Sequence, residues 1–341
     1  MKINGSNFLN IIIIFAVSIL LIVLLVLLFS DNPLKTLFFF FIGPFINIFS
    51  FANMLNAVTP LIFGGLAVTI AMKTGNLNLG GEGQVYFGAF ITTITALALS
   101  SLGAAAALIA VIAGSLCSGI LAALCGFCKA KWKTNELITT FLLSCAVIPI
   151  VNYFITGPFM DPYTSLLSTR KIAENMTLPA LIKNTNLSSG LLIALVFVPI
   201  VHFFLNKSKM GYEFRITGIN ELFARYGGIK TKLNTVISMA MSGFLYGLAG
   251  SISILGTYHA AIKEFSSGLG WSGLTVALIA GFSPVSVIPC AIFLAWINSG
   301  ARIAMQNTGL TYEIAVIVQA VIFMLSTSLL IKNLNFKRKM R

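Results

Sequence analysis

The chain has 341 residues, of which 57% are hydrophobic and 9% are charged, with a formal net charge of +13. Soluble domains carry about 25% charged residues, so this chain has too few of them to cover a water-facing surface. Its composition therefore excludes an ordinary soluble protein and predicts one that is embedded in a lipid bilayer.

Apolar stretches long enough to cross a bilayer recur along the chain, because a spanning helix needs about 20 predominantly apolar residues. The first stretch follows Lys2 as a signal peptide would, but it is too long, and residues 30–33 offer no small-residue cleavage site. We predict an all-α membrane protein with about ten transmembrane helices. The predicted spans are 8–29, 52–72, 84–100, 103–128, 136–157, 188–206, 233–256, 268–282, 285–302 and 312–331.

The basic residues favour one orientation, since Lys and Arg are retained on the cytoplasmic side of a membrane. With an even number of spans and the N-terminus inside, most of the 22 basic residues are cytoplasmic. Both termini are therefore predicted to be cytoplasmic, and the positive charge is interpreted as a topology signal and an attraction to anionic lipid rather than to nucleic acid. The basic residues predicted outside are Lys35, Arg170, Lys171, Lys183, Lys263 and Arg302.

No catalytic, metal or cofactor site is predicted. The five cysteines fall inside predicted spans, and although Cys125 and Cys128 have metal-like spacing, no second pair or nearby histidine completes a site. We interpret the cysteines as buried, small apolar side chains. His202 and His259 are separated by a whole span. The chain also lacks a phosphate-binding loop and a paired histidine and carboxylate, so it is not expected to hydrolyse ATP by itself.

The two halves of the chain repeat a short pattern. Residues 65–67 and 247–249 both read Gly-Leu-Ala, and each is followed by a glycine-rich break, at 74–84 and 266–273. Interrupted helices in internal repeats build many transporter folds, because backbone released from a helix can line a path; a chance match in apolar sequence is the alternative. We predict one transmembrane domain over 1–341, with halves at 52–157 and 233–331, an external loop at 158–187 and a cytoplasmic loop at 207–232.

The break at 74–84 combines glycines with polar side chains. Its four glycines remove side chains where the backbone bends or is closely approached. Asn78, Glu82 and Gln84 place polar groups beside an apolar helix, where each needs a partner. A plain turn explains the glycines but not the polar cluster, so we predict a structural or gating role. The candidate gate or path residues are Asn78, Gly80, Glu82, Gly83, Gln84, Gly268 and Gly270.

The loop at 207–232 contains a predicted amphipathic helix. Ile219, Leu222, Phe223 and Tyr226 recur at helical spacing and share one face. Asn220 can cap the start of this helix, and the two glycines that follow it can end it. So short a helix is marginal by itself and needs a surface to rest on. That surface is either a protein partner or lipid headgroups.

Three of these motifs resemble those of a known family. The run from Thr74 to Gln84 resembles the motif of permease subunits in the ribose, galactose and nucleoside branch of the bacterial ABC importers. The pattern from Gly268 to Pro284 is similar to the second-half signature of that family, and the stretch from Gly211 to Ile229 resembles its loop that docks on the ATPase. The predicted docking residues are Gly211, Tyr212, Arg215, Gly218, Asn220, Phe223, Ala224, Tyr226 and Gly228.

The resemblance implies a multi-pass permease of the bacterial cell (inner) membrane, paired with an identical or paralogous second permease subunit. ABC ATPase subunits would supply the energy, and an extracytoplasmic substrate-binding lipoprotein would deliver a small polar solute. The docking loop most resembles that of nucleoside permeases paired with basic-membrane-lipoprotein receptors, and a ribose or galactose permease is the alternative. An ion-coupled secondary transporter, with Glu82 as its ion-linked carboxylate, is a further alternative.

Overall fold

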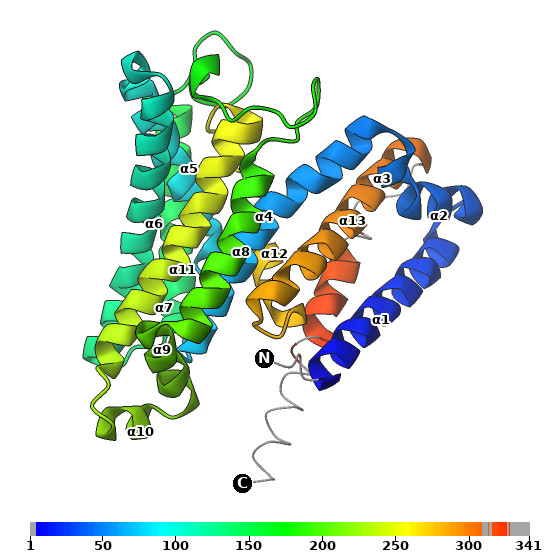
Figure 1. Cartoon of the computed structure of the whole chain (residues 1–341). Helices are drawn as coiled ribbons and strands as arrows, with labels where there is room; N and C mark the ends of the chain where they lie inside the picture. The colour runs from blue at the N-terminus through cyan, green and yellow to red at the C-terminus, as the bar shows by residue number, and fades with distance from the viewer. Residues whose placement is uncertain (1–4, 309–312, 314–315, 326, 328–341) are drawn as a thin grey trace.

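The computed structural model describes residues 5–308, 313, 316–325 and 327. In this part of the chain every regular element is a helix. Figure 1 shows two groups of helices, α5 to α8 with α11 on one side and α1 with α13 on the other. The elements are α1 (Gly5–Phe29), α2 (Pro33–Phe41), α3 (Gly43–Ile46), α4 (Ile48–Lys73), α5 (Gly81–Ala98), η1 (Ser100–Leu102), α6 (Ala104–Trp132), α7 (Glu136–Thr156), η2 (Glu174–Met176), α8 (Gly190–Lys207), α9 (Lys209–Ile219), α10 (Glu221–Tyr226), α11 (Thr231–Ser253), η3 (Ile254–Tyr258), α12 (Leu269–Ile279), α13 (Pro284–Thr308) and the helical residues Val316–Leu325.

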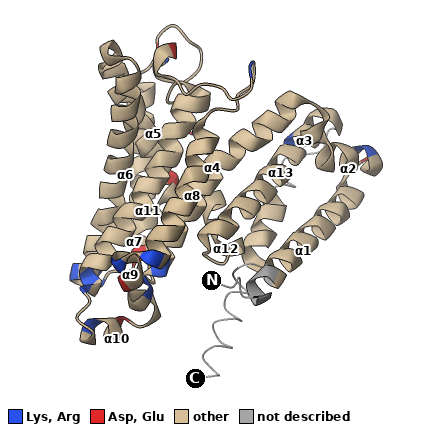
Figure 2. Ribbon diagram, in the orientation of Figure 1, with Lys and Arg blue, Asp and Glu red and all other residues tan. Residues whose placement is uncertain are grey.

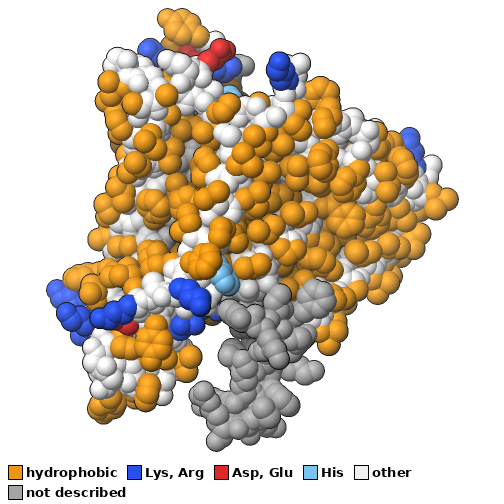
Figure 3. Space-filling model, viewed as in Figure 1, with side chains coloured by type: hydrophobic (Ala, Val, Ile, Leu, Met, Phe, Trp, Pro, Cys, Tyr) orange, Lys and Arg blue, Asp and Glu red, His pale blue; other side chains and the backbone are white. Residues whose placement is uncertain are grey.

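Seven helices of the described residues are long and apolar enough to cross a membrane: α1, α4, α6, α7, α8, α11 with η3, and α13. Three predicted spans are not among them. α5 carries Glu82 and Gln84 in its first turn, α12 is only 11 residues long, and the predicted span 312–331 lies partly outside the described residues. Lys and Arg collect at the end of the molecule that bears α9 and α10 (Figure 2), and hydrophobic side chains cover the face between its two ends (Figure 3).

The segment between the first two predicted spans is helical, although the sequence analysis assigned no element there. α2 begins with Pro33 at its first position, and the Asn32 side chain accepts a hydrogen bond from the Lys35 nitrogen at 3.3 Å. α4 begins at Ile48 rather than at 52, because the Asn47 side chain caps it by accepting from the Ser50 nitrogen at 2.7 Å. Side-chain caps at Asn32 and Asn47 therefore explain why α2 and α4 begin where they do.

Three other predictions need correction. Residues 81–84 belong to the first turn of α5 and not to the break, since the Gln84 nitrogen bonds to the Gly80 carbonyl at 3.0 Å. Arg302 lies inside α13, which continues to Thr308. The cysteines are not all buried: Cys145 is exposed on α7, a helix in which only 28% of the apolar stretch is buried.

α4 and α11 form the centre of the molecule. In each, 78% of the residues in the membrane-spanning apolar stretch are buried, against 22% in α1. α11 packs on α4, α5 and α6, while α4 also contacts α8, α12 and α13. The first long helix of each predicted half is therefore the most enclosed one; in Figure 1, α4 lies between the two groups of helices and α11 lies within the group of α5 to α8.

Each central helix crosses the second helix of the other predicted half at a pair of glycines. A Cβ on Gly64 of α4 would lie 2.9 Å from the Cα of Gly273 in α12, and a Cβ on Gly88 of α5 would lie 2.7 Å from the Cα of Gly247 in α11. Membrane helices use small residues at crossings because the backbones can then approach closely. The two crossings interlock the halves.

A loop of residues 157–189 covers one end of the bundle, opposite α9 and α10 (Figure 1). Its backbone is tied to the segment after α11: the Ile172 nitrogen donates to the His259 carbonyl at 2.8 Å, and the Thr169 nitrogen donates to the Ala261 carbonyl at 3.0 Å. These bonds order the loop over the end of α11.

Candidate functional site

The two glycine-rich breaks meet at Glu82. Its carboxylate accepts one hydrogen bond from the Gly268 nitrogen and one from the Gly270 nitrogen, both at 2.9 Å. These two amides stand at the start of α12, where the first N–H groups of a helix have no partner within it. A carboxylate also suits the positive end of the helix dipole. Glu82 therefore ties the start of α5 to the start of α12, and we name this contact the Glu82 clamp.

The clamp requires glycine at 270. A Cβ added there would lie 2.2 Å from the Glu82 nitrogen and 2.6 Å from the Gly81 carbonyl carbon. Real Cβ contacts are never this short, so a side chain at this position would force the two backbones apart. The buried Tyr246 hydroxyl of α11 donates to the Gly270 carbonyl at 3.4 Å and so also holds the start of α12 in place.

The other polar residues of the first break satisfy one another. The Asn78 amide nitrogen donates to the Gln84 side-chain oxygen at 2.8 Å and to the Ser242 hydroxyl of α11 at 3.0 Å. In return, the Asn78 oxygen accepts from the Gln84 amide at 3.1 Å and from the Gly80 nitrogen at 3.0 Å. The Gly83 nitrogen donates to the Ser144 hydroxyl of α7 at 2.7 Å. This network fixes the bend between α4 and α5.

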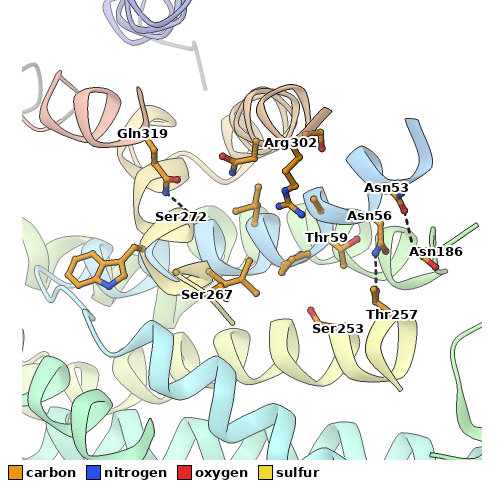
Figure 4. Close-up of a pocket in the computed structure, with 18 of the residues that line it drawn as sticks. Asn53, Asn56, Thr59, Asn186, Ser253, Thr257, Ser267, Ser272, Arg302 and Gln319 are labelled. Carbon is orange, nitrogen blue, oxygen red and sulfur yellow. Dashed lines mark hydrogen bonds between the residues drawn. The ribbon is translucent and has the colours of Figure 1, made fainter. Parts of the chain in front are cut away.

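A cavity of about 830 Å³ lies between α4, α11, α12 and α13 (Figure 4). Most of its polar lining consists of amide and hydroxyl side chains. Three pairs of them are hydrogen bonded: the Asn56 amide donates to the Thr257 hydroxyl at 2.8 Å, the Gln319 amide to the Ser272 hydroxyl at 2.9 Å, and the Asn186 amide to the Asn53 side-chain oxygen at 3.3 Å. Trp271 adds an aromatic surface. Such a mixture suits a small polar solute with an apolar face.

Two buried oxygens of the lining have no hydrogen-bond partner among the described residues, Thr59 Oγ1 and Asn298 Oδ1. Buried polar groups are nearly always paired, so these acceptors mark places where a donor from a solute can bind. Arg302 is the one charged residue of the described lining. No group of three His, Cys, Asp or Glu residues suited to a metal ion occurs in the part of the chain that the structure describes.

Most of the predicted gate or path residues lie next to this cavity and do not line it. Gly268 is the one member of that set that lines the cavity. Glu82 and Gly270 hold the segment to which Gly268 belongs, and Asn78 and Gln84 lie in the network behind it. The set thus comes together in space around one wall of the cavity.

The polar side chains that line the cavity were not predicted from the sequence, although a signal for them was present. Asn53, Asn56 and Thr59 recur at every third position of an otherwise apolar span, and Asn298 and Arg302 are four residues apart on another. Polar side chains on one face of a membrane helix point to a solute path.

The predicted amphipathic helix forms at the opposite end of the molecule as α10 (Glu221–Tyr226), but Ile219, which was predicted to share its apolar face, is the last residue of α9, because Asn220 is extended and separates the two helices. The Asn220 side chain caps it by accepting from the Phe223 nitrogen at 3.0 Å. Gly228, with φ of +79°, turns the chain out of the helix. The apolar face is left uncovered, with Phe223 66% and Tyr226 91% exposed. An uncovered aromatic face on a six-residue helix can rest on a protein partner or on lipid headgroups.

The remaining docking residues divide by environment. Tyr212 is exposed like the aromatics of α10, whereas Ala224 is buried on its inner side. Arg215 of α9 is partly buried, and its Nε has no partner among the described residues. Gly211 lies where a Cβ would approach the Phe204 carbonyl oxygen to 2.2 Å.

Gly218 fastens α9 to the first break. A Cβ there would lie 2.4 Å from the Lys73 carbonyl oxygen and 3.0 Å from the Gly75 nitrogen. We expect Gly218→Val to separate α9 from α4 and to lower the melting temperature of the purified protein, whereas Gly227→Val, where a Cβ meets nothing closer than 3.5 Å, should change it little. Thermal unfolding of the two variants in detergent checks this, and equal melting temperatures would contradict a tight contact at 218.

Membrane-crossing helices around a cavity with amide and hydroxyl side chains in its lining are the features that a solute permease requires. Residues 50–327 match the family model described as the permease component of the branched-chain amino acid transport system. The chain belongs to this family. It is an ABC transporter permease and a multi-pass protein of the cell membrane, in agreement with the resemblance seen in the sequence.

The chain is similar to several ABC permeases over most of its length. It is 32% identical over 300 residues to the probable riboflavin import permease RfuC of Treponema pallidum (strain Nichols), covering 87% of this chain and 79% of that protein. It is also 32% identical to the guanosine permease NupP of Bacillus subtilis (strain 168), covering 84% and 83%. Identity to the nucleoside permease NupB of Lactococcus lactis is 28%, covering 91% and 88%.

Proposed function

We propose that this permease carries a nucleoside-like solute, meaning a flat heterocycle joined to a hydroxylated sugar or sugar alcohol. The observation that supports this best is the cavity, where the Trp271 ring offers a stacking surface beside amide and hydroxyl side chains. The named solutes of the similar permeases, riboflavin, guanosine and nucleosides, all have this two-part chemistry.

The proposed topology has about ten spans with both termini in the cytoplasm. α9 and α10 then face the cytoplasm, and the loop 157–189 faces outward. The concentration of Lys and Arg at the α9 and α10 end supports this orientation (Figure 2). Asn186 and Ser188, at the end of the outward loop, line the cavity, so in this topology a solute enters from outside. The glycine crossings of α4 with α12 and of α5 with α11 support the pairing of two related halves.

Partners follow from this topology. An ABC ATPase would rest on the uncovered face of α10 and on the exposed Tyr212 of α9. A substrate-binding lipoprotein would release the solute at the outward mouth of the cavity, and a second permease subunit, identical or paralogous, would complete the membrane pair. The Glu82 clamp would act as a gate, because it holds the cavity wall around Gly268 against the start of α5.

Reconstitution of the complete complex in proteoliposomes tests the proposal. We expect uptake of labelled nucleosides that requires ATP and stops when the partner ATPase is inactivated, while the purified permease alone shows no ATPase activity. Uptake driven by an ion gradient alone would contradict an ATP-driven mechanism. Uptake of ribose or galactose in preference to every nucleoside would contradict the solute class and favour the sugar alternative.

A further inference from the structure

We infer that Arg302 selects solutes inside the cavity, favouring heterocycles that present a carbonyl oxygen next to a ring nitrogen, as in guanosine and inosine, over those that present an amino group there, as in adenosine. This inference rests on the proposed function and adds a specificity-determining residue to it.

Arg302 is placed to meet a solute. It projects from α13 into the cavity, toward the side of α4 that carries Asn56 and Thr59 (Figure 4). The ion pairs between described residues, Lys129 with Glu136 and Arg225 with Glu221, lie elsewhere. Among the described residues Arg302 has no ion pair or hydrogen bond, and the described part of the cavity lining contains no carboxylate.

The chemistry of the guanidinium group decides which solute it prefers. It has five N–H donors in a rigid fork, no acceptor, and a permanent charge. Such a fork pairs with two adjacent acceptors, and its preferred base partner is the O6 and N7 edge of guanine. Adenine presents a donor in place of O6, which opposes another donor. The solute that supplies both acceptors is therefore favoured over one that supplies a single acceptor.

Two oxygens near Arg302 can bind other parts of the same solute. Asn298 lies one helical turn before Arg302, on the same face of α13. Its side-chain oxygen and the Thr59 hydroxyl oxygen are buried without partners among the described residues. Both can accept from N–H or O–H groups of the solute. A 6-oxopurine nucleoside offers acceptors on one edge and donors on the ring and ribose, so it can use Arg302 and these oxygens together.

The test measures binding to the permease itself, because the binding protein has a selectivity of its own. The permease–ATPase complex, in nanodiscs and without the binding protein, is titrated with labelled guanosine. Unlabelled inosine, adenosine and guanosine monophosphate then compete. We expect inosine to compete better than adenosine by roughly tenfold or more, the discrimination typical of a bidentate arginine contact. Arg302→Gln should remove the preference for inosine or reverse it, because a glutamine amide can pair with the N6 and N7 edge of adenine.

Two further variants keep the result interpretable. Arg302→Lys retains a charged donor that can also contact O6 and N7 but lacks the rigid fork, so it should bind nucleosides and keep only part of the preference. Arg170→Gln, which removes an exposed arginine of the outward loop, should keep it. Two results with Arg302→Gln would overturn the inference: an equal loss of binding for all nucleosides, or a preference for inosine that persists. Two results with the unaltered complex would also overturn it: stronger competition by the monophosphate than by inosine, or no binding of guanosine. Nucleoside uptake by the complete complex would still uphold the proposed function.

Discussion

Glu82→Ala should reduce ATP-driven uptake by roughly tenfold or more, because it removes the acceptor of two backbone amides at the start of α12. Hydrogen bonds to a charged group contribute about 1.5–3 kcal/mol each, and a buried donor without a partner adds a penalty. Without the clamp, the wall around Gly268 loses its connection to α5. Initial rates of solute uptake in proteoliposomes, normalised to the amount of inserted permease, measure the effect.

Two variants calibrate this result. Glu82→Gln keeps one accepting oxygen and should give an intermediate rate. Glu174→Gln changes an exposed carboxylate in the loop 157–189 and should leave the rate nearly unchanged. Equal and mild effects of the substitutions at 82 and 174 would indicate that the first break is an ordinary turn and that the Glu82 clamp has no role in transport.

The double variant Phe223→Ala, Tyr226→Ala should lose the ATPase during purification while still reaching the membrane. Aromatic residues at the centre of an interface commonly contribute about 2 kcal/mol or more each. A loss of about 4 kcal/mol lowers affinity by roughly three orders of magnitude. Uptake should fall with it, and co-purification of the ATPase with tagged permease gives the direct measurement.

Controls separate protein docking from contact with lipid. Tyr163→Ala removes an aromatic side chain that is 89% exposed in the loop at the other end, and it should not affect the ATPase. Lys230→Gln with Lys232→Gln should alter lipid preference if the loop rests on anionic headgroups. Full retention of the ATPase with normal uptake in the aromatic double variant would rule out α10 as the docking element.

The docking end and the cavity are joined by a short series of contacts. α9 touches the backbone at Lys73 and Gly75 through Gly218. The break then runs into α5, where the Glu82 clamp holds α12 and the wall segment at Gly268. A movement of α9 imposed by an ATPase would therefore reach the cavity through packed backbone. Coupling of this kind is established only when both ends shift one equilibrium, which is why the Glu82 and α10 variants belong in the same uptake assay.

The sequence by itself determined the features that depend on neighbouring residues. Hydropathy located the long helices, because crossing a bilayer demands a continuous apolar run. Capping and periodicity located α10, its Asn220 cap and the aromatic face that the structure leaves exposed. The polar break at 74–84 was also recognisable, since unpaired polar groups beside an apolar helix must find partners.

Only the tertiary structure decided what those residues contact. The Glu82 carboxylate binds amides 186 and 188 positions away, and a local pattern contains no information about such a pairing. The same is true of the cavity: Asn56 and Arg302 occupy separate helices, and they face one space only because α4 and α13 pack side by side. Helix formation follows from short-range propensity and hydropathy, whereas a binding site forms where close packing brings distant polar side chains together.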